Sequence, residues 1–93
     1  MSESRRYTIS VFSENTPGVL NRITIIFTRR KVNIESLTVS ETEKKGVSRF
    51  TIVVVCDEKM SQKLVRAINR TIEVVDVFAS ENRELFFQEV AFY

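Results

Sequence analysis

Apolar and polar positions follow two different periods along this chain of 93 residues, and the changes of period mark its elements. Four stretches either alternate between apolar and polar residues or are almost continuously apolar and β-branched, as strands are. Between them, apolar residues recur at steps of three and four, which is the period of an amphipathic helix. The predicted strands are 7–13, 32–41, 48–56 and 71–79, and the predicted helices are 17–30 and 57–70.

The order of these elements is strand, helix, strand, strand, helix, strand, which predicts a ferredoxin-like α+β fold, βαββαβ, with an antiparallel sheet and both helices on one face. The stretch 32–41 predicts a half-exposed edge strand, whereas 48–56 predicts a central one. Residues 43–46 join the two as a hairpin turn, and 80–82 are expected to turn the chain into an extra aromatic strand at 84–93. The two predicted faces of the edge strand are Ile34, Ser36, Thr38 and Ser40 against Glu35, Leu37 and Val39.

The start of the first helix carries the candidate chemistry. Thr16 is expected to cap the helix and Pro17 to take its first position, where a missing N–H costs nothing. Gly18 then leaves the unpaired amides of the first turn open, and their partial positive charge favours a carboxylate by about 0.3 to 1 kcal/mol. Asn15 both donates and accepts, so it suits a ligand with a carboxylate and an ammonium group. The same residues are ordinary turn and cap residues, and the pattern alone leaves both interpretations open.

The composition is that of a soluble globular protein of one domain, with 43% hydrophobic and 28% charged residues. The longest apolar run, 52–56, is too short to cross a membrane, and the first residues lack the apolar core of a signal peptide. The single cysteine, Cys56, cannot form an internal disulfide and is expected to fill space near the end of a strand. We therefore expect a reducing, cytoplasmic location.

The charge pattern argues against a nucleic-acid binder and against most enzymes. The net charge is +2 with both signs interspersed, and the one tight basic cluster, 29–31, falls at the end of the first helix, where it complements the helix dipole. The sequence has no histidine, and its acidic residues are scattered rather than paired. General acid–base and nucleophilic catalysis therefore have few candidate residues.

Four segments of the chain are similar to those of a known family. They read ENTPGVLNR at 14–22, VNIESLTVS at 32–40, SRFTIVV at 48–54 and FFQEVAFY at 86–93. With the helix that follows the first segment, they resemble the regulatory ACT domain of the small subunit of acetohydroxyacid (acetolactate) synthase, from about Tyr7 to Tyr93. The resemblance implies a non-catalytic regulatory subunit in which two ACT domains pair through edge strands into a homodimer.

The resemblance also implies a ligand and a second partner. Branched-chain amino acids, valine foremost, bind at the seam of the dimer and cause feedback inhibition of branched-chain amino-acid biosynthesis. The large catalytic subunit carries the thiamine diphosphate, magnesium and FAD, so no cofactor is expected on this chain. By the same resemblance, one protomer provides Asn15, Pro17, Gly18, Val19 and Leu20 to the site, and the other provides Asn33 and Ile34.

The resemblance divides the chain into an ACT domain at 5–80 and a short remainder at 81–93. Bacterial relatives usually carry a second domain after the ACT domain, and this remainder resembles the opening strand of that domain, which is expected to be absent or truncated, so that the chain is either a fragment or a short form. Its aromatic residues are expected to seek a partner strand. The resemblance therefore does not imply that this chain alone activates the catalytic subunit.

Three alternatives remain open from the sequence. An ACT domain that senses another amino acid for another enzyme has the same pattern, because side chains that differ by one methylene are distinguished by only about 1 to 3 kcal/mol. An acylphosphatase-like enzyme shares the fold and uses an arginine and an asparagine. An RNA-recognition fold shares the topology, but the third predicted strand offers Phe50 alone for base stacking, and a lone aromatic there is expected to pack in the core.

Overall fold

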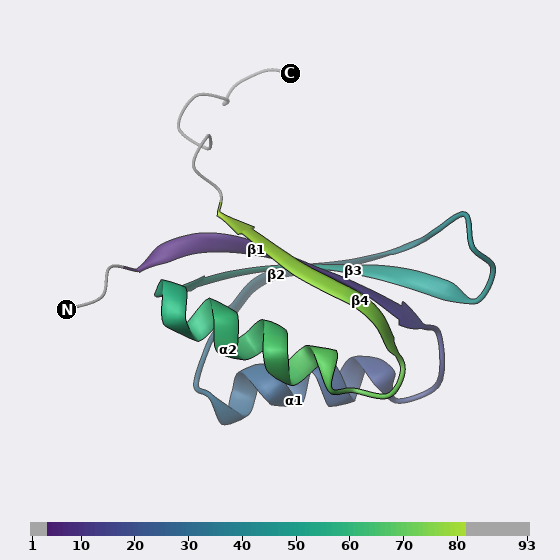
Figure 1. Cartoon of the computed structure of the whole chain (residues 1–93), viewed down its shortest axis with the longest axis horizontal. Coiled ribbons are helices and arrows are strands. Elements are labelled where there is room, and N and C mark those ends of the chain that lie inside the picture. The colour runs from purple at the N-terminus through teal and green to yellow at the C-terminus, as the bar shows by residue number, and fades with distance from the viewer. Residues whose placement is uncertain (1–3, 82–93) are drawn as a thin grey trace, which may run out of the picture.

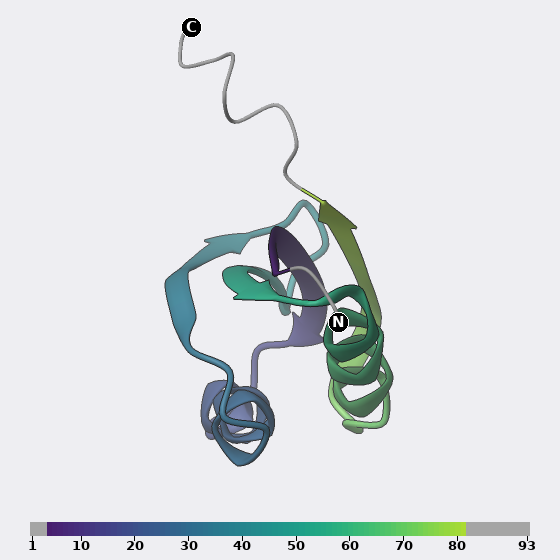
Figure 2. The ribbon, with the colours of Figure 1, turned by 90° about the vertical axis from the view of Figure 1, so that its left-hand side faces the viewer.

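The computed structural model describes residues 4–81, which form a four-stranded antiparallel sheet with two helices on one face (Figure 1, Figure 2). The elements are β1 (Arg5–Glu14), α1 (Val19–Arg29), β2 (Ile34–Glu41), β3 (Val47–Cys56), α2 (Glu58–Asn69) and β4 (Val74–Glu81). The strands lie in the order β2, β3, β1, β4. The predicted ferredoxin-like α+β fold is confirmed.

The hydrophobic core lies between the sheet and the helices and follows from the alternation on the strands. In β3, every second residue from Ser48 to Cys56 is buried, and these residues face the helices. The helices contribute Val19, Ile23, Phe27, Leu64 and Ile68. Burying one such apolar side chain contributes roughly 1.5 to 3 kcal/mol of transfer free energy. The same packing fixes the position of α1 and of the loop that leads into it.

β2 and β4 are the edge strands and β3 is central, which confirms the predictions for 32–41 and 48–56. β2 pairs antiparallel with β3, but the register shifts between Ile34 and Ser36. The shift places Ile34, which pairs with Val54, on the helix-facing side together with the following apolar residues of the strand. The predicted division of faces was wrong at Ile34, because a bulge adds one residue to the alternation.

α2 begins as predicted after Asp57, whose Oδ1 accepts a hydrogen bond of 2.7 Å from the amide of Met60. Ser61, which was not predicted to lie in the core, is buried on the apolar side of this helix. Its hydroxyl donates to the carbonyl of Glu58 at 2.7 Å, so the buried polar group is satisfied locally. No helix among residues 4–81 is long and apolar enough to span a membrane.

β4 differs from its prediction at both ends. It begins only at Val74, because 71–73 form a hydrogen-bonded turn after α2. It also continues to Glu81, since Ser80 and Glu81 still pair with β1. The turn predicted to begin at Ser80 is therefore wrong, because the long central strand offers pairing partners to these polar residues. The extra strand predicted at 84–93 lies outside the described residues.

Candidate functional site

α1 begins at a tight turn, not at the predicted cap. The amide of Val19 donates to the carbonyl of Thr16 at 3.3 Å, and Gly18 between them has φ 84° and ψ −6°. These are features of a type II β-turn, which favours proline at its second position and glycine at its third. Gly18 is therefore the N-cap. The predictions of Thr16 as N-cap and Pro17 as first helical residue are wrong, because the Pro–Gly pair forms the turn instead.

Backbone hydrogen bonds hold this turn in place from two sides. The amide of Asn15 donates to the carbonyl of Gly46 at 2.9 Å, in the hairpin predicted at 43–46. The amide of Glu14 donates to the carbonyl of Glu73 at 2.9 Å, just before β4. A ligand that arrives at the turn meets a backbone already fixed in position, which lowers the ordering cost of binding.

The groups exposed at the turn are hydrogen-bond donors. The amides of Leu20 and Asn21 donate to no acceptor within residues 4–81, as expected in the first turn of a helix. This first turn contains no acidic side chain. The side chain of Asn15 is exposed, and in the same part of the chain it makes no hydrogen bond. The arrangement suits a small carboxylate with a second polar group beside it.

Val19 and Leu20, which were predicted together for the site, face different ways. Val19 is 3% exposed and packs in the core, so it presents only its backbone to the turn. Leu20 is 39% exposed. At the helical period it lies on the opposite flank of α1 from Arg22 and Ile25, which face α2. α1 lies below β2 (Figure 2), so the flank of α1 that faces away from α2 is on the β2 side of the molecule. By the helical period, this is the flank to which Leu20 belongs.

Asn33 and Ile34 lie at the other end of α1. The chain leaves the helix through Lys31, which has φ 58°, and reaches β2 at Ile34, with Asn33 exposed just before it. The 11 residues of α1 span about 16 Å, so one chain does not bring these two residues to Gly18. A single site that contains both groups requires a second chain.

The basic cluster 29–31 stands at the end of α1, as predicted. Arg29 is the last helical residue, and Nη1 of Arg30 donates to the carbonyl of Ile26 at 3.2 Å. Positive charge at these last carbonyls stabilises the helix through its dipole. The role predicted for the cluster is therefore confirmed for Arg30.

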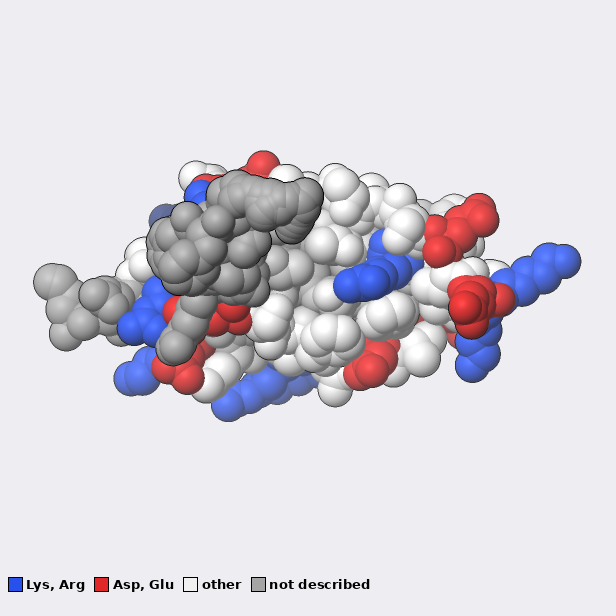
Figure 3. Space-filling view, turned by 90° about the horizontal axis from the view of Figure 1, so that it is seen from above, with Lys and Arg blue, Asp and Glu red and all other residues white. Residues whose placement is uncertain are grey.

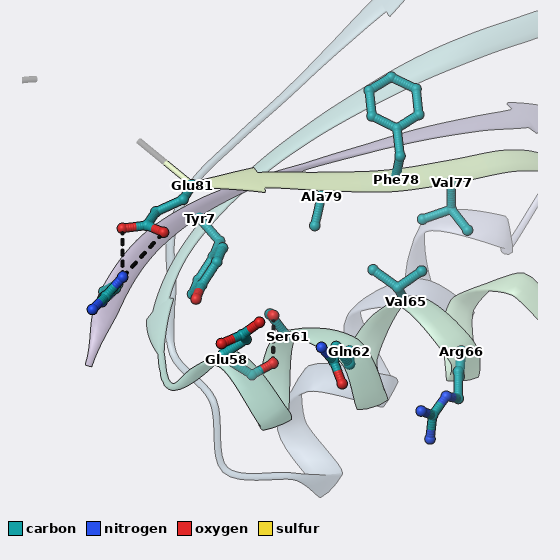
Figure 4. A pocket seen from close by; sticks show the side chains of 11 residues that line it. Tyr7, Glu58, Ser61, Gln62, Val65, Arg66, Val77, Phe78, Ala79 and Glu81 are labelled. Carbon is teal, nitrogen blue, oxygen red and sulfur yellow. Dashed lines mark hydrogen bonds and ion pairs between the residues drawn. The ribbon is translucent and has the colours of Figure 1, made fainter. Parts of the chain in front are cut away.

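A groove of about 610 Å³ runs between α2 and β4 (Figure 4). The ring of Tyr7 is buried at its base, and its hydroxyl points toward Glu58 and Ser61. Burial and then the charges of Glu81 and Glu58 raise the pKa of Tyr7 above its ordinary value of 10.0. Glu81 is paired with Arg5 at 3.1 Å. Tyr7 thus stays protonated at neutral pH, where it can donate a hydrogen bond but cannot act as a base.

Cys56 is buried at the end of β3, which agrees with its predicted role as an apolar filler. Burial, together with the charge of Asp57, raises the pKa of its thiol. A buried thiol of raised pKa is a poor nucleophile. Within residues 4–81, no three His, Cys, Asp or Glu residues are grouped so that they could hold a metal ion.

The face of the sheet away from the helices (Figure 3) carries a cluster that the sequence analysis missed. The rings of Phe12 and Phe78 have centroids 6.1 Å apart, and the guanidinium of Arg49 lies 5.7 Å from the Phe12 centroid. Alternation along each strand put these residues on one face, but the pairing of the strands was needed to bring them together. Phe50, by contrast, is buried in the core as predicted. Charges of both signs lie mostly toward the ends of this face, unlike the concentrated basic surface of an RNA-binding sheet.

Solved structures define the class of protein to which this fold belongs. The chain matches the ACT domain from GTP pyrophosphokinase of Chlorobium tepidum with a TM-score of 0.71 at 16% identity, over 84% of this chain and 100% of that one. It matches the acetolactate synthase small subunit from Thermotoga maritima with a TM-score of 0.75 at 36% identity, over 81% of this chain and 47% of that one. The βαββαβ fold is that of an ACT domain.

Sequence comparison identifies the family within this class. The model of the acetohydroxyacid synthase (AHAS) small subunit-like ACT domain matches residues 9–76, and the chain belongs to this family. It is 47% identical over 72 residues to the probable acetolactate synthase small subunit of Archaeoglobus fulgidus, over 77% of this chain and 45% of that protein. The chain spans about half the length of the curated relatives it matches. The family resemblance seen in the sequence is confirmed.

Proposed function

We propose that this chain is the amino-acid-sensing, non-catalytic domain of an acetolactate synthase small subunit. In this role, residues 5–80 bind a branched-chain amino acid, valine foremost, and pass feedback inhibition to the catalytic subunit. The observation that carries the proposal is the rigid turn at the start of α1, where the amides of Leu20 and Asn21 have no acceptor within residues 4–81. Membership of the family supports the kind of ligand and partner.

The ligand backbone lies at the turn in this proposal. Its carboxylate accepts hydrogen bonds from the first-turn amides, where the helix dipole favours negative charge by up to about 2 kcal/mol when partly buried. The carbonyl of the Asn15 side chain accepts from the ammonium group. Pro17 and Gly18 set the shape of the turn, and Gly18 lets the ligand approach because it has no side chain. Val19 contributes backbone and Leu20 apolar surface to the same site.

A second protomer completes the site in this proposal. Within residues 4–81, no strand pairs with the outer edge of β2, and two such edges can pair into a continuous sheet. Asn33 and Ile34 of one protomer then reach the helix start of the other, because the two-fold symmetry of a dimer exchanges the two ends of α1. Two exposed apolar side chains support an interface on this side, Leu20 at 39% and Val39 at 51% exposure.

The size of the ligand limits its affinity. Valine is small, and we expect binding of about −6 to −8 kcal/mol, which is micromolar or weaker. A site shared between protomers links ligand binding to the arrangement of the dimer, and a coupling of about 1 to 3 kcal/mol is enough for allosteric regulation. The catalytic subunit, which shares the cytoplasm with this chain, carries the thiamine diphosphate, magnesium and FAD.

Calorimetric titration with valine tests the proposal. The chain is titrated at a concentration where sedimentation finds a dimer, with leucine, isoleucine and serine as comparison ligands. We expect saturable binding of branched-chain amino acids that Asn15→Ala abolishes. Gln62→Ala, an exposed amide on α2, serves as the matched control and binds normally. Binding of serine in preference to valine would favour an ACT domain of a different enzyme, and no binding from a folded dimer would contradict the sensing function.

A further inference from the structure

A groove between the two helices has no part in the proposed ligand site. It measures about 570 Å³ and is lined by residues of both helices and of the turn that follows α2. Four apolar side chains and four charged ones dominate its lining, and they come from α1, from the end of α2 and from the turn before β4. They are Ile25, Ile26, Ala67 and Ile72, with Arg22, Arg29, Arg70 and Glu73.

Two apolar side chains of this groove are exposed to solvent. Ile72 is 94% exposed and Ile25 is 38% exposed. Ile72 lies in a fixed turn, because the amide of Thr71 donates to Ile68 at 3.0 Å and the carbonyl of Glu73 accepts from Glu14 at 2.9 Å. A side chain of this size held in solvent on a rigid turn forms an apolar surface that a partner can cover.

The charges around the groove are mostly positive. Glu73 is the one carboxylate in its lining, and it is paired with Arg22. Arg29 and Arg70 have no acidic partner within residues 4–81. Arg29 is the last residue of α1 and Arg70 is the C-cap of α2, so each helix leaves one positive charge for the carboxylates of a partner.

We infer that this groove docks an acidic amphipathic helix of the catalytic subunit, an inference that rests on the proposed function. The apolar face of the helix covers Ile25 and Ile72, and its carboxylates pair with Arg29 and Arg70. This is the helix-in-groove mode of recognition, with charge complementarity selecting the partner. The partner is a protein and not a nucleic acid because the groove has exposed apolar side chains, which a phosphate backbone would not cover.

Arg22 connects this docking groove with the amino-acid site. Its backbone amide donates to the carbonyl of Gly18 at 3.1 Å, and its guanidinium group lies at the rim of the groove. Glu73 has a similar double role, since its side chain pairs with Arg22 while its carbonyl holds the loop before the turn. A ligand that shifts the start of α1 therefore also shifts one wall of the groove, which gives feedback inhibition a physical route.

Two substitutions test the inference through association of the full chain with the acetolactate synthase large subunit of the same organism. Ile72→Ser removes apolar surface without disturbing the core, and Arg29→Glu reverses one charge of the rim. We expect each to weaken association by about tenfold or more, as loss of a central interface residue does. Raising the salt concentration weakens the wild-type complex as well, because the pairing is partly ionic.

The matched controls are Val75→Ser and Lys45→Glu, which make the same kinds of change at exposed positions outside the groove. Both controls are expected to associate as the wild type does, and all four variants are expected to bind valine normally. Wild-type association by Ile72→Ser and Arg29→Glu would overturn the docking groove while leaving the proposed function intact. Failure of the wild-type chain itself to associate would contradict the proposed function and the inference with it. If sedimentation found a changed dimer dissociation constant for Ile72→Ser and Arg29→Glu but not for the two controls, the groove would be a contact between two copies of this chain, and the inference would be overturned.

Discussion

At the scale of single residues, the backbone of Gly18 sets the geometry of the proposed site. Its positive φ closes the type II turn and aims the first-turn amides outward. From the sequence, Gly18 was predicted to leave the first-turn amides open. Thr16 was predicted as the N-cap and Pro17 as the first helical residue, although both are turn residues. A local pattern of Thr-Pro-Gly fits both a helix cap and a type II turn, and the hydrogen bonds from Asn15 and Glu14 to distant loops decide between them.

Gly18→Ala is expected to lower the free energy of unfolding by about 1 kcal/mol, because a side chain at φ 84° is strained. A steric clash does not contribute, because the added Cβ would lie 3.5 Å from Nη1 of Arg22, which is an ordinary van der Waals contact. Gly46→Ala is a matched control, with φ 83° and open space around the position. Urea denaturation is expected to give similar losses for both variants, whereas valine titration is expected to weaken only for Gly18→Ala. Equal valine affinity in the two variants would argue against a site at the turn.

Tyr7 provides a prediction in the alkaline range. Its pKa is raised in the folded state, so its contribution to stability is complete below pH 10 and is lost as the pH rises through the folded-state pKa. The chain has two tyrosines, so Tyr93→Phe leaves Tyr7 as the sole source of phenolate absorbance. We expect a titration midpoint above 10.0 for this variant. A midpoint at or below that value would show that burial does not protect the hydroxyl.

At the scale of elements, strand and helix order, the edge position of β2 and the cap of α2 all follow from hydrophobic period and local chemistry. The bulge at Ile34, the extension of β4 to Glu81 and the pairing of Phe12 with Phe78 do not, because each depends on the register between strands. The same limit applies to the candidate site. Asn15 and Gly18 were predicted for the site from their own local pattern, whereas Val19, Leu20, Asn33 and Ile34 were assigned to it only by family resemblance.

The outer edge of β2, which pairs with no strand in the part of the chain that the structure describes, is predicted to form the dimer. Val39→Glu places a charge on an exposed apolar side chain of this strand, and burying that charge in an interface is costly. We expect the dimer dissociation constant to rise by at least about tenfold in sedimentation equilibrium. Val55→Glu makes the same change at an exposed valine of β3, away from the edge, and should leave the constant unchanged. Equal effects of the two substitutions would contradict pairing through β2.

At the scale of the whole molecule, α1 connects the two surfaces proposed here. In the proposal, its start binds the amino acid, its end leads to the strand that pairs with the other protomer, and its flank lines the docking groove with α2. The helix spans about 16 Å, too far for one chain to complete the site. The central claim is therefore that valine binds between protomers, with Asn15 from one chain and Asn33 from the other.

Mixing two inactive variants tests this claim most directly. Asn15→Ala and Asn33→Ala are each expected to form dimers without valine binding, because every site in those dimers lacks one partner. In a mixed dimer, one of the two sites receives both native asparagines, so random exchange restores about a quarter of the wild-type sites. Calorimetric titration of the exchanged mixture, against the two variants alone, measures this recovery. Valine binding that reappears on mixing is the predicted result, and a mixture as inactive as its components, or either variant binding valine by itself, would contradict the shared site.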